Sequence, residues 1–324
     1  MAIQPIFIFS LSRSGSTLVQ RIIAAHDGVA TTSEPWILLP YLYVFRKRGV
    51  MAEYDHSLMV NAVQDFCKEL PAGESDYREE LRDFVLGLYE KAAGPDATHF
   101  LDKTPPYCLI ADEIIRLFPD AKFVFLWRNP LSVVASIIES LNGGRWYPTM
   151  FRGDLFVGLP RLITAYLANH SRAYAVRFED LIDPGKNHWE PLMDYLGIEF
   201  DPQTLDRFSD VKLNGRMGDP TGVKKYSALS SDPLTKWKGI LANPLRRAWC
   251  KRYLRFLGRD RLKTMGYDLD QLMDQLSSLP MSTSSLAGDL GDSVVDLVKE
   301  PLRLHMRRRE MGEGTNVLRE LLKA

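Results

Sequence analysis

The residues between Ser10 and Leu18 combine one glycine, several hydroxyl side chains and an arginine. They follow a short apolar run and precede a segment with helical apolar spacing. In such a turn from strand to helix, backbone N–H groups and the positive end of the helix dipole can face an anion. We therefore predict an oxyanion site made by Arg13, Ser14, Gly15, Ser16, Thr17 and Leu18.

The order of these residues differs from that of a Walker A loop, which reads Gly-x4-Gly-Lys-Ser/Thr. Ser10 stands in place of its first glycine and Ser16 in place of its lysine, while the positive charge lies before the glycine, at Arg13. This order disfavours a nucleoside triphosphatase. A turn that merely connects a strand to a helix is the alternative interpretation.

A second candidate phosphate site follows the apolar run Ala121–Trp127. Arg128, at the end of this expected strand, suits a charge-assisted, bidentate contact with a phosphate. Ser136 lies two turns along the next expected helix and could add a hydroxyl group. Taken singly, Arg128 could equally form a strand-end ion pair, and Ser136 could be a small surface residue.

Composition and charge narrow the class of protein. The chain has 324 residues, and 41 basic residues balance 41 acidic ones, which gives no reason to expect a nucleic-acid partner. Cys67, Cys108 and Cys250 are odd in number and far apart, as expected for thiols in a reducing compartment. Because the sequence shows neither a signal peptide nor a membrane span, we expect a cytoplasmic protein.

Short apolar runs alternate with helical patterns along the chain. Strands are predicted at Pro5–Phe9, His99–Leu101, Ala121–Trp127 and Ala173–Phe178, and helices from Leu18 on, at Leu109–Phe118 and at Leu131–Leu141. The alternation predicts an α/β, P-loop-like three-layer fold with a central, mostly parallel sheet. In such a fold, ligands bind at the carboxyl ends of the strands.

The domain organisation is expected to be one core domain over residues 1–273. It would contain a helical insertion at about 41–94 that could roof the site. Residues 274–290 include a serine-rich stretch and are expected to link the core to a helical appendage at 291–324. An apolar stripe in the appendage favours docking on the core or on a second subunit in a homodimer, with peripheral membrane contact as the alternative.

Both phosphate motifs resemble those of a known family. Arg13-Ser-Gly-Ser-Thr-Leu18 is similar to the 5′-phosphosulfate loop of the sulfotransferases that use 3′-phosphoadenosine 5′-phosphosulfate (PAPS). Its arginine is typical of the tyrosylprotein enzymes and of many bacterial or carbohydrate enzymes. The stretch from Phe123 to Ser136 resembles the family's 3′-phosphate motif. The resemblance implies that Arg128 and Ser136 hold the 3′-phosphate of the donor.

Further stretches extend the resemblance over about Ile6–Gly239. Glu34 lies 21 residues after Arg13, where tyrosylprotein-type sulfotransferases carry a catalytic glutamate. Lys103, within Leu-Asp-Lys-Thr-Pro, resembles the family's lysine at a strand end. Lys236 and Trp237 resemble its late nucleotide contact.

The sequence departs from the family pattern in three places, one of them near Ser140, where a second arginine of some relatives has no counterpart. Phe178 stands where the family usually has a tyrosine, so a hydroxyl contact with the nucleotide is replaced by packing or stacking. The late serine that helps to bind the leaving phosphate has no clear counterpart, and Thr221 is only a candidate for it.

The resemblance implies a mechanism in which positive charge stabilises the departing phosphate. Arg13 would hold the phosphosulfate, Lys103 would contact the bridging oxygen, and Glu34 would take the proton from the acceptor hydroxyl. His26 is a weaker alternative for the base, because it continues an apolar helical face. The transferred group carries a single negative charge, so no metal is expected to be required, and the six histidines form no metal-site spacing.

Two other classes of function stay open at this stage. A P-loop kinase-like phosphotransferase lacks support because the Walker lysine and a strand-end aspartate for magnesium are both missing. A non-catalytic nucleotide-binding protein would not need Glu34 and Lys103. For a sulfotransferase, we rank a glycan or glycolipid hydroxyl first as acceptor, a peptidyl tyrosine second and a small alcohol third. The stretch Asn142–Pro148 could form an acceptor loop, or its aromatic residues could pack in the core.

Overall fold

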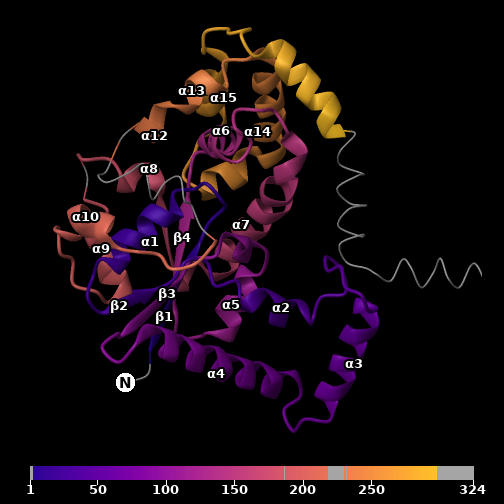
Figure 1. Cartoon of the computed structure of the whole chain (residues 1–324), viewed down its shortest axis with the longest axis vertical. Coiled ribbons are helices and arrows are strands. Elements are labelled where there is room, and N and C mark those ends of the chain that lie inside the picture. Colours follow the sequence, from indigo (N-terminus) through magenta and orange to yellow (C-terminus); the bar gives the residue numbers. More distant parts are fainter. Residues whose placement is uncertain (1–2, 186, 218–229, 231, 298–324) are drawn as a thin grey trace, which may run out of the picture.

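The computed structural model describes residues 3–185, 187–217, 230 and 232–297 (Figure 1). Its centre is a sheet of five parallel strands in the order β2-β3-β1-β4-β5. The strands are β1 (Gln4–Phe9), β2 (Val29–Thr31), β3 (His99–Asp102), β4 (Lys122–Trp127) and β5 (Ala173–Arg177). This sheet confirms the expected α/β fold. The short edge strand β2 was not among the predicted strands.

Helices cover both faces of the sheet. The elements of the first half are α1 (Ser16–Ala24), α2 (Leu38–Tyr43), α3 (His56–Lys68), α4 (Glu74–Ala93), η1 (Pro105–Leu109), α5 (Ala111–Leu117) and α6 (Pro130–Ser140). Those of the second half are η2 (Pro148–Phe151), η3 (Gly153–Gly158), α7 (Leu159–Asn169), η4 (His170–Arg172), α8 (Phe178–Leu181), α9 (Trp189–Leu196), α10 (Thr204–Arg207), η5 (Phe208–Asp210), α12 (Asp232–Thr235), α13 (Trp237–Ile240), α14 (Pro244–Thr264) and α15 (Leu269–Ser277).

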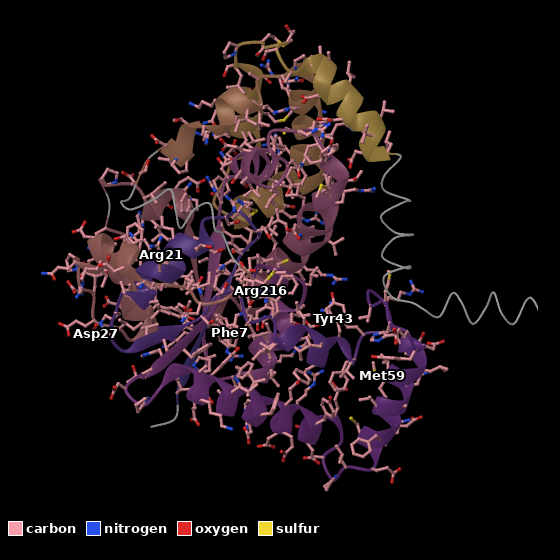
Figure 2. All side chains as sticks on the ribbon, in the orientation of Figure 1. Phe7, Arg21, Asp27, Tyr43, Met59 and Arg216 are labelled. Carbon is pink, nitrogen blue, oxygen red and sulfur yellow. The ribbon has the colours of Figure 1, made fainter. Side chains whose placement is uncertain are left out.

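Alternate residues of the central strands enter two separate apolar clusters, because successive side chains of a strand point to opposite faces. In β1, Ile6 and Ile8 pack with α1 and α9, whereas Phe7 and Phe9 pack with α4 and α5. Phe7 lies within the cluster formed with α4 and α5, whereas Met59 lies far from it on α3 (Figure 2). Burial on both faces explains why these strands read as continuous apolar runs.

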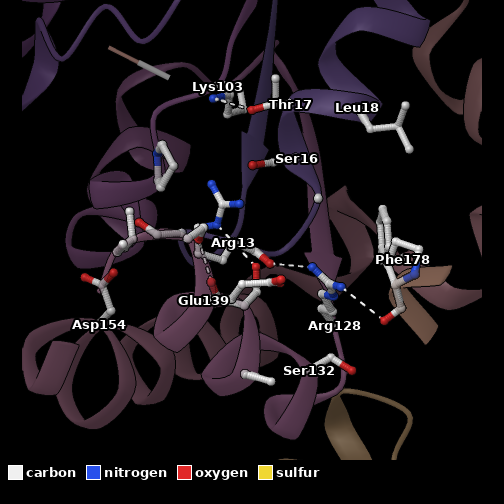
Figure 3. A pocket seen from close by; sticks show the side chains of 18 of the residues that line it. Arg13, Ser16, Thr17, Leu18, Lys103, Arg128, Ser132, Glu139, Asp154 and Phe178 are labelled. Carbon is white, nitrogen blue, oxygen red and sulfur yellow. Dashed lines mark hydrogen bonds between the residues drawn. The ribbon is translucent and has the colours of Figure 1, made fainter. Parts of the chain in front are cut away.

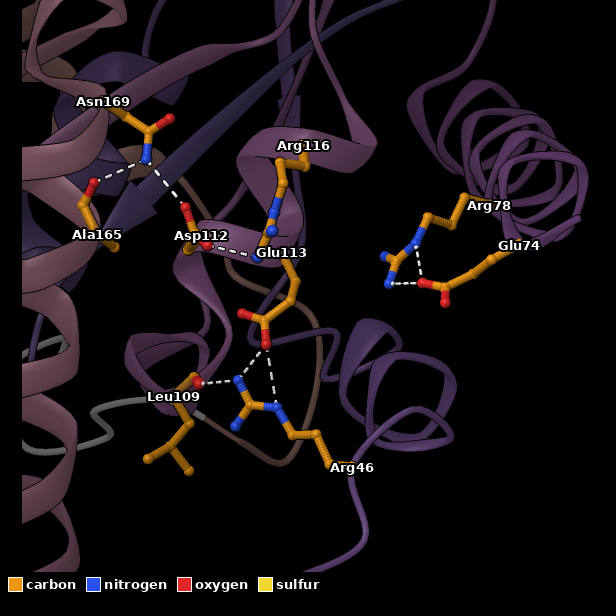
Figure 4. Close-up of polar contacts among 9 residues, drawn as sticks. All are labelled: Arg46, Glu74, Arg78, Leu109, Asp112, Glu113, Arg116, Ala165 and Asn169. Atoms are coloured by element: carbon orange, nitrogen blue, oxygen red, sulfur yellow. Dashed lines mark hydrogen bonds and ion pairs between the residues drawn. The ribbon is translucent and has the colours of Figure 1, made fainter. Parts of the chain in front are cut away.

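The insertion consists of α2, α3 and α4. Helix α4 lies along the sheet (Figure 1) and buries Leu81, Val85 and Tyr89 in the core. Surface ion pairs surround it (Figure 4): Arg46 binds Glu113 of α5, and Arg78 pairs with Glu74 one turn earlier on α4. The insertion therefore extends one helical layer of the core.

The helix after α15 is tied to the core by its acidic side chains. Residues 286–297 are helical, and the non-helical connection before them runs from 278 to 285. Asp289 receives two 2.7 Å hydrogen bonds from Arg246, and Asp296 accepts one from the Thr149 amide at 2.9 Å. The described beginning of the expected appendage thus contacts the core. The remainder, from 298 on, lies outside the described residues.

None of the helices in the described part of the chain combines the length and the apolar composition needed to cross a bilayer.

Candidate functional site

A cavity of about 600 Å³ opens at the carboxyl ends of the central strands, where the fold class leads one to expect a ligand. The predicted site residues that line it are Arg13, Gly15, Ser16, Thr17, Leu18, Glu34, Lys103, Arg128, Ser136, Phe178, Lys236 and Trp237. Ser14 is buried and is not among the lining residues. Thr221 lies outside the described residues.

The loop between β1 and α1 needs its glycine for two reasons. Gly15 has φ 85°, in the left-handed region that other residues rarely adopt. A Cβ atom at this position would also lie 2.2 Å from the Phe178 ring. The phenylalanine that departs from the family pattern therefore packs on the phosphate loop, directly before helix α1 begins at Ser16.

The two phosphate motifs meet at the cavity wall (Figure 3). The Arg13 Nε donates to Ser136 Oγ at 3.3 Å, and Arg128 Nη1 donates to the carbonyl oxygen of Arg13 at 2.7 Å. The Arg128 guanidinium also lies over the Phe178 ring, 4.8 Å from its centroid. Asn129 caps α6 through a 2.9 Å hydrogen bond from the Leu131 amide. Two guanidinium groups and a hydroxyl, which are groups that can contact an anion, thus line one cavity.

Lys103 and Glu34 face each other across the loop. Lys103 follows β3 directly, is only 1% exposed and places its Nζ 2.8 Å from Glu34 Oε1. The same Nζ is 3.4 Å from Thr17 Oγ1 at the start of α1. The second carboxylate oxygen of Glu34 accepts a 3.2 Å hydrogen bond from the Trp36 indole. An acid–base pair is therefore held next to the anion cradle.

The late Lys236-Trp237 pair closes another wall. Lys236 forms an ion pair with Glu139 of α6, and Trp237 is 3% exposed at the start of α13. Both positions line the cavity, as the resemblance implied. Sequence analysis gave no role to Glu139, because a lone glutamate near a helix end is usually a surface residue.

The expectation that the insertion roofs the site is wrong, and of the two alternatives for Asn142–Pro148 the structure favours packing. No described residue of the insertion at 41–94 lines the cavity, so this segment does not roof it, because α4 packs along the sheet instead of over its carboxyl edge. None of Asn142–Pro148 lines the cavity either. Trp146 of this stretch is buried against Trp249 of α14, with ring centroids 5.6 Å apart, which is the packing alternative. His26 is likewise absent from the lining residues.

Besides Glu139, the charged residues Asp154 and Arg21 on the cavity wall were not predicted from the sequence. Asp154 belongs to the π-helical turn η3, and burial raises the pKa of its carboxyl although Ser12 donates a hydrogen bond to it. Arg21 of α1 is 3% exposed and lies over the Phe208 ring, and burial lowers the pKa of its guanidinium. For Arg21, the sequence offered only the signal of a basic residue on a largely apolar helix. Such a residue fits a surface position equally well.

Among the residues whose placement is described, no three His, Cys, Asp or Glu side chains lie close enough together to hold an ion.

Comparison with known sequences identifies the matching family. The model described as "Sulfotransferase family" matches residues 5–202, which is more than half of the chain. Nodulation protein NoeE of Sinorhizobium fredii is 25% identical over 290 residues, covering 81% of this chain, and the chain spans 65% of the length of that protein. The protein-tyrosine sulfotransferase of Drosophila melanogaster is 28% identical over 134 residues, which is 41% of this chain and 25% of that protein.

Comparison with solved structures supports the fold. The sulfotransferase domain from the curacin biosynthetic pathway superposes with a TM-score of 0.51 at 23% identity, covering 74% of this chain and 91% of that domain. The parallel sheet and its surrounding helices are therefore shared with a sulfotransferase domain.

Proposed function

The chain belongs to the sulfotransferase family, and on this premise we propose that it moves a sulfuryl group from PAPS to a hydroxyl acceptor and releases 3′-phosphoadenosine 5′-phosphate (PAP). The observation that carries the proposal is the buried pair of Lys103 and Glu34 beside the phosphate loop. A cation for the leaving group and a carboxylate for the incoming hydroxyl are the two groups that this reaction needs.

The donor would lie along the wall formed by the two phosphate motifs. Arg13 and the N-terminus of α1 suit the 5′-phosphosulfate, because a helix N-terminus favours an anion. Arg128 and Ser136 suit the 3′-phosphate, and the Phe178 ring supplies an apolar surface beside them. The cavity volume of about 600 Å³ is sufficient for a nucleotide-sized ligand.

The transfer would be an in-line displacement at sulfur. The acceptor oxygen attacks the sulfur atom while the bond from sulfur to the bridging oxygen breaks, and the electron pair of that bond stays on the departing phosphate. Lys103 contacts the bridging oxygen and stabilises its growing negative charge. Glu34 takes the proton of the acceptor hydroxyl. No metal ion takes part in these steps.

For the acceptor we propose a glycan or glycolipid hydroxyl first. Polar and charged side chains, Asp154 and Glu139 among them, line the cavity beside the phosphate motifs and suit an acceptor with several hydroxyl groups. A peptidyl tyrosine is the second candidate, supported by the likeness to the protein-tyrosine sulfotransferase of Drosophila melanogaster. A small alcohol is the third. A cytoplasmic location and a homodimer stay predictions.

The test is a transfer assay with PAPS carrying radiolabelled sulfate. The purified chain is incubated with oligosaccharides, a tyrosine-containing peptide or simple alcohols, in the presence of EDTA. We expect labelled product from a hydroxyl acceptor without added metal. In a parallel assay with magnesium in place of EDTA, we expect none when ATP labelled in its γ-phosphate replaces PAPS. Phosphoryl transfer from ATP would favour the kinase alternative, and PAP binding without any transfer would favour a non-catalytic nucleotide-binding protein.

A further inference from the structure

A second carboxylate lies directly before Lys103, on the other face of the sheet. Asp102 is the last residue of β3 and is 1% exposed. Because side chains alternate along a strand, Lys103 faces α1, whereas Asp102 faces α4 and η1. Asp102 is not among the residues that line the cavity. Any part that it plays in the reaction must therefore pass through other residues.

Three hydroxyl groups donate hydrogen bonds to Asp102. Tyr89 and Tyr107 bind its Oδ2 atom at 2.7 and 3.3 Å, and Thr104 binds its Oδ1 atom at 2.8 Å. An ionised carboxylate only accepts hydrogen bonds, so each hydroxyl uses its single proton for Asp102. The oxygen of each hydroxyl then has lone pairs available for other donors.

Two of these hydroxyls accept backbone N–H groups from the segment that carries Glu34. The Leu38 amide donates to the Tyr107 hydroxyl at 3.2 Å, and the Trp36 amide donates to Thr104 Oγ1 at 3.5 Å. The Tyr89 hydroxyl has no such bond to this segment in the described part of the chain. Asp102 thus fixes the direction of two hydroxyls that hold the segment Glu34–Leu38.

This segment requires support because its backbone is strained. Trp36 has φ 60°, and the left-handed region costs a residue with a side chain about 1–2 kcal/mol. The Trp36 indole also donates to Glu34 Oε2 at 3.2 Å. The position of the Glu34 carboxylate opposite Lys103 therefore depends on the conformation of the Trp36 backbone.

We propose that Asp102 is a positioning residue that holds the segment Glu34–Leu38 through Tyr107 and Thr104, so that Glu34 faces the reacting hydroxyl. The inference rests on the proposed function of Glu34 as the base. The titratable groups that face Asp102 are Tyr89 from α4, Tyr107 from η1 and Lys103 from the end of its own strand. Burial raises the pKa of the carboxyl to about 6, so at neutral pH it is mostly ionised and only accepts.

The two tyrosines offer a matched test. Tyr107→Phe and Tyr89→Phe each remove one hydrogen bond to the same oxygen of Asp102, but only the Tyr107 hydroxyl also holds the Leu38 amide. We expect Tyr107→Phe to lower kcat by about tenfold through misplacement of Glu34. Tyr89→Phe should leave kcat unchanged within about twofold, although it removes the shorter bond. Both variants should keep the dissociation constant for PAP, because neither tyrosine lines the cavity.

A readout other than activity accompanies the assay. Hydrogen exchange of the peptide that contains Trp36 and Leu38 should become faster in Tyr107→Phe than in Tyr89→Phe. The two variants are compared at the same number of degrees below their own melting temperatures. Thr104→Val should act like Tyr107→Phe, and Thr104→Ser, which keeps the hydroxyl, should restore kcat. Equal loss of kcat in both tyrosine variants, in proportion to their loss of melting temperature, would overturn the proposal.

Failure of the proposed function would look different. If the wild-type chain transfers no sulfuryl group to any acceptor, the role of Glu34 as base fails whatever the variants do. If the wild type is active but the exchange of the Trp36–Leu38 peptide is the same in both tyrosine variants, only the positioning role of Asp102 fails.

Discussion

The ion pair of Lys103 and Glu34 differs in its surroundings from the ion pairs around α4 and α5. The side chains of Lys103 and Glu34 are 1% and 11% exposed, whereas those of Arg78 and Glu74 are 28% and 48% exposed (Figure 4). Taking two charges out of water costs several kcal/mol per ion unless partners compensate. An exposed pair costs little to form and contributes about 0–1 kcal/mol.

The difference indicates that the free-energy cost of burying charges falls at the candidate site, where charged groups are needed for the reaction. The buried pair lies on the cavity wall, next to a residue with a left-handed backbone, Trp36, and above a network of buried hydroxyls around Asp102. The surface pairs only join neighbouring turns or helices. Variants at the buried pair should therefore lower kcat, whereas variants at the surface pairs should change only the free energy of unfolding.

The largest effect is expected for Lys103→Ala. Loss of the cation that stabilises the departing phosphate should lower kcat by about 10³-fold. Arg78→Ala is the control at an exposed pair and should leave kcat unchanged. Steady-state kinetics with PAPS measures both. A Lys103→Ala enzyme that keeps most of its turnover would show that the buried pair is structural.

Glu34→Gln should lower kcat by about 10²-fold or more, because glutamine cannot take the proton of the acceptor hydroxyl. Its amide can still accept from the Trp36 indole, so the fold of the segment should be kept. Isothermal titration should give the wild-type affinity for PAP. Full turnover together with normal PAP binding would remove Glu34 from the role of base.

Asp102 should make the pH dependence of stability differ from that of an exposed carboxylate. Burial raises its pKa from 3.8 to about 6, so this group contributes stability that is fully present below pH 3.8 and is lost as pH rises through 6. The difference in unfolding free energy between wild type and Asp102→Asn should therefore fall by at most about 3 kcal/mol from pH 4 to pH 7. Urea titrations across this range measure it.

Asp55 provides the control of opposite sign. It caps α3, and hydrogen bonds from the Leu58 and Ser57 amides lower the pKa of its carboxyl. Its contribution is present above the unfolded pKa and is lost as pH falls through the folded one, in the region below about pH 4. If the Asp102 and Asp55 differences change in the same direction with pH, the contrast between buried and exposed charges fails.

Local features of the fold could be predicted from the sequence, whereas contacts made by tertiary packing could not. The central strands and the turns that carry Gly15 and Arg128 were predictable because continuous apolar runs and turn chemistry are local signals. Strand β2 was missed because it is only three residues long. The partners of Asp102 were missed because Tyr89 comes from α4, and only tertiary packing brings that helix to β3.

Lys103 and Glu34 were each predicted as site residues, but their mutual contact was not. They are 69 positions apart in the chain, and the parallel sheet brings β2 and β3 side by side so that the segments after them meet. A sequence pattern can therefore predict which residue types do chemistry. The distance between them comes from the topology.

Arg128→Ala should affect binding of the donor more than turnover. A charge-assisted contact with the 3′-phosphate is worth about 1.5–3 kcal/mol, so the affinity for PAP should fall by roughly tenfold to a hundredfold. The control lies in the ligand: 5′-AMP lacks the 3′-phosphate, and its affinity should stay near the wild-type value. Equal losses for both nucleotides would show that Arg128 only supports the loop through the Arg13 carbonyl.

The smallest effects are expected in the surface region, and they should be confined to stability. Arg46 donates to Glu113 and to the Leu109 carbonyl, the latter at 2.7 Å, so Arg46→Ala should lower the unfolding free energy by about 1 kcal/mol. Arg78→Ala, at a single-turn pair, should lower it by about 0.5 kcal/mol. Chemical denaturation measures both, and kcat should not change in either. A loss of kcat in Arg46→Ala would mean that the insertion is coupled to the site, because Arg46 reaches α5 and η1, the two elements that follow Lys103 in the chain.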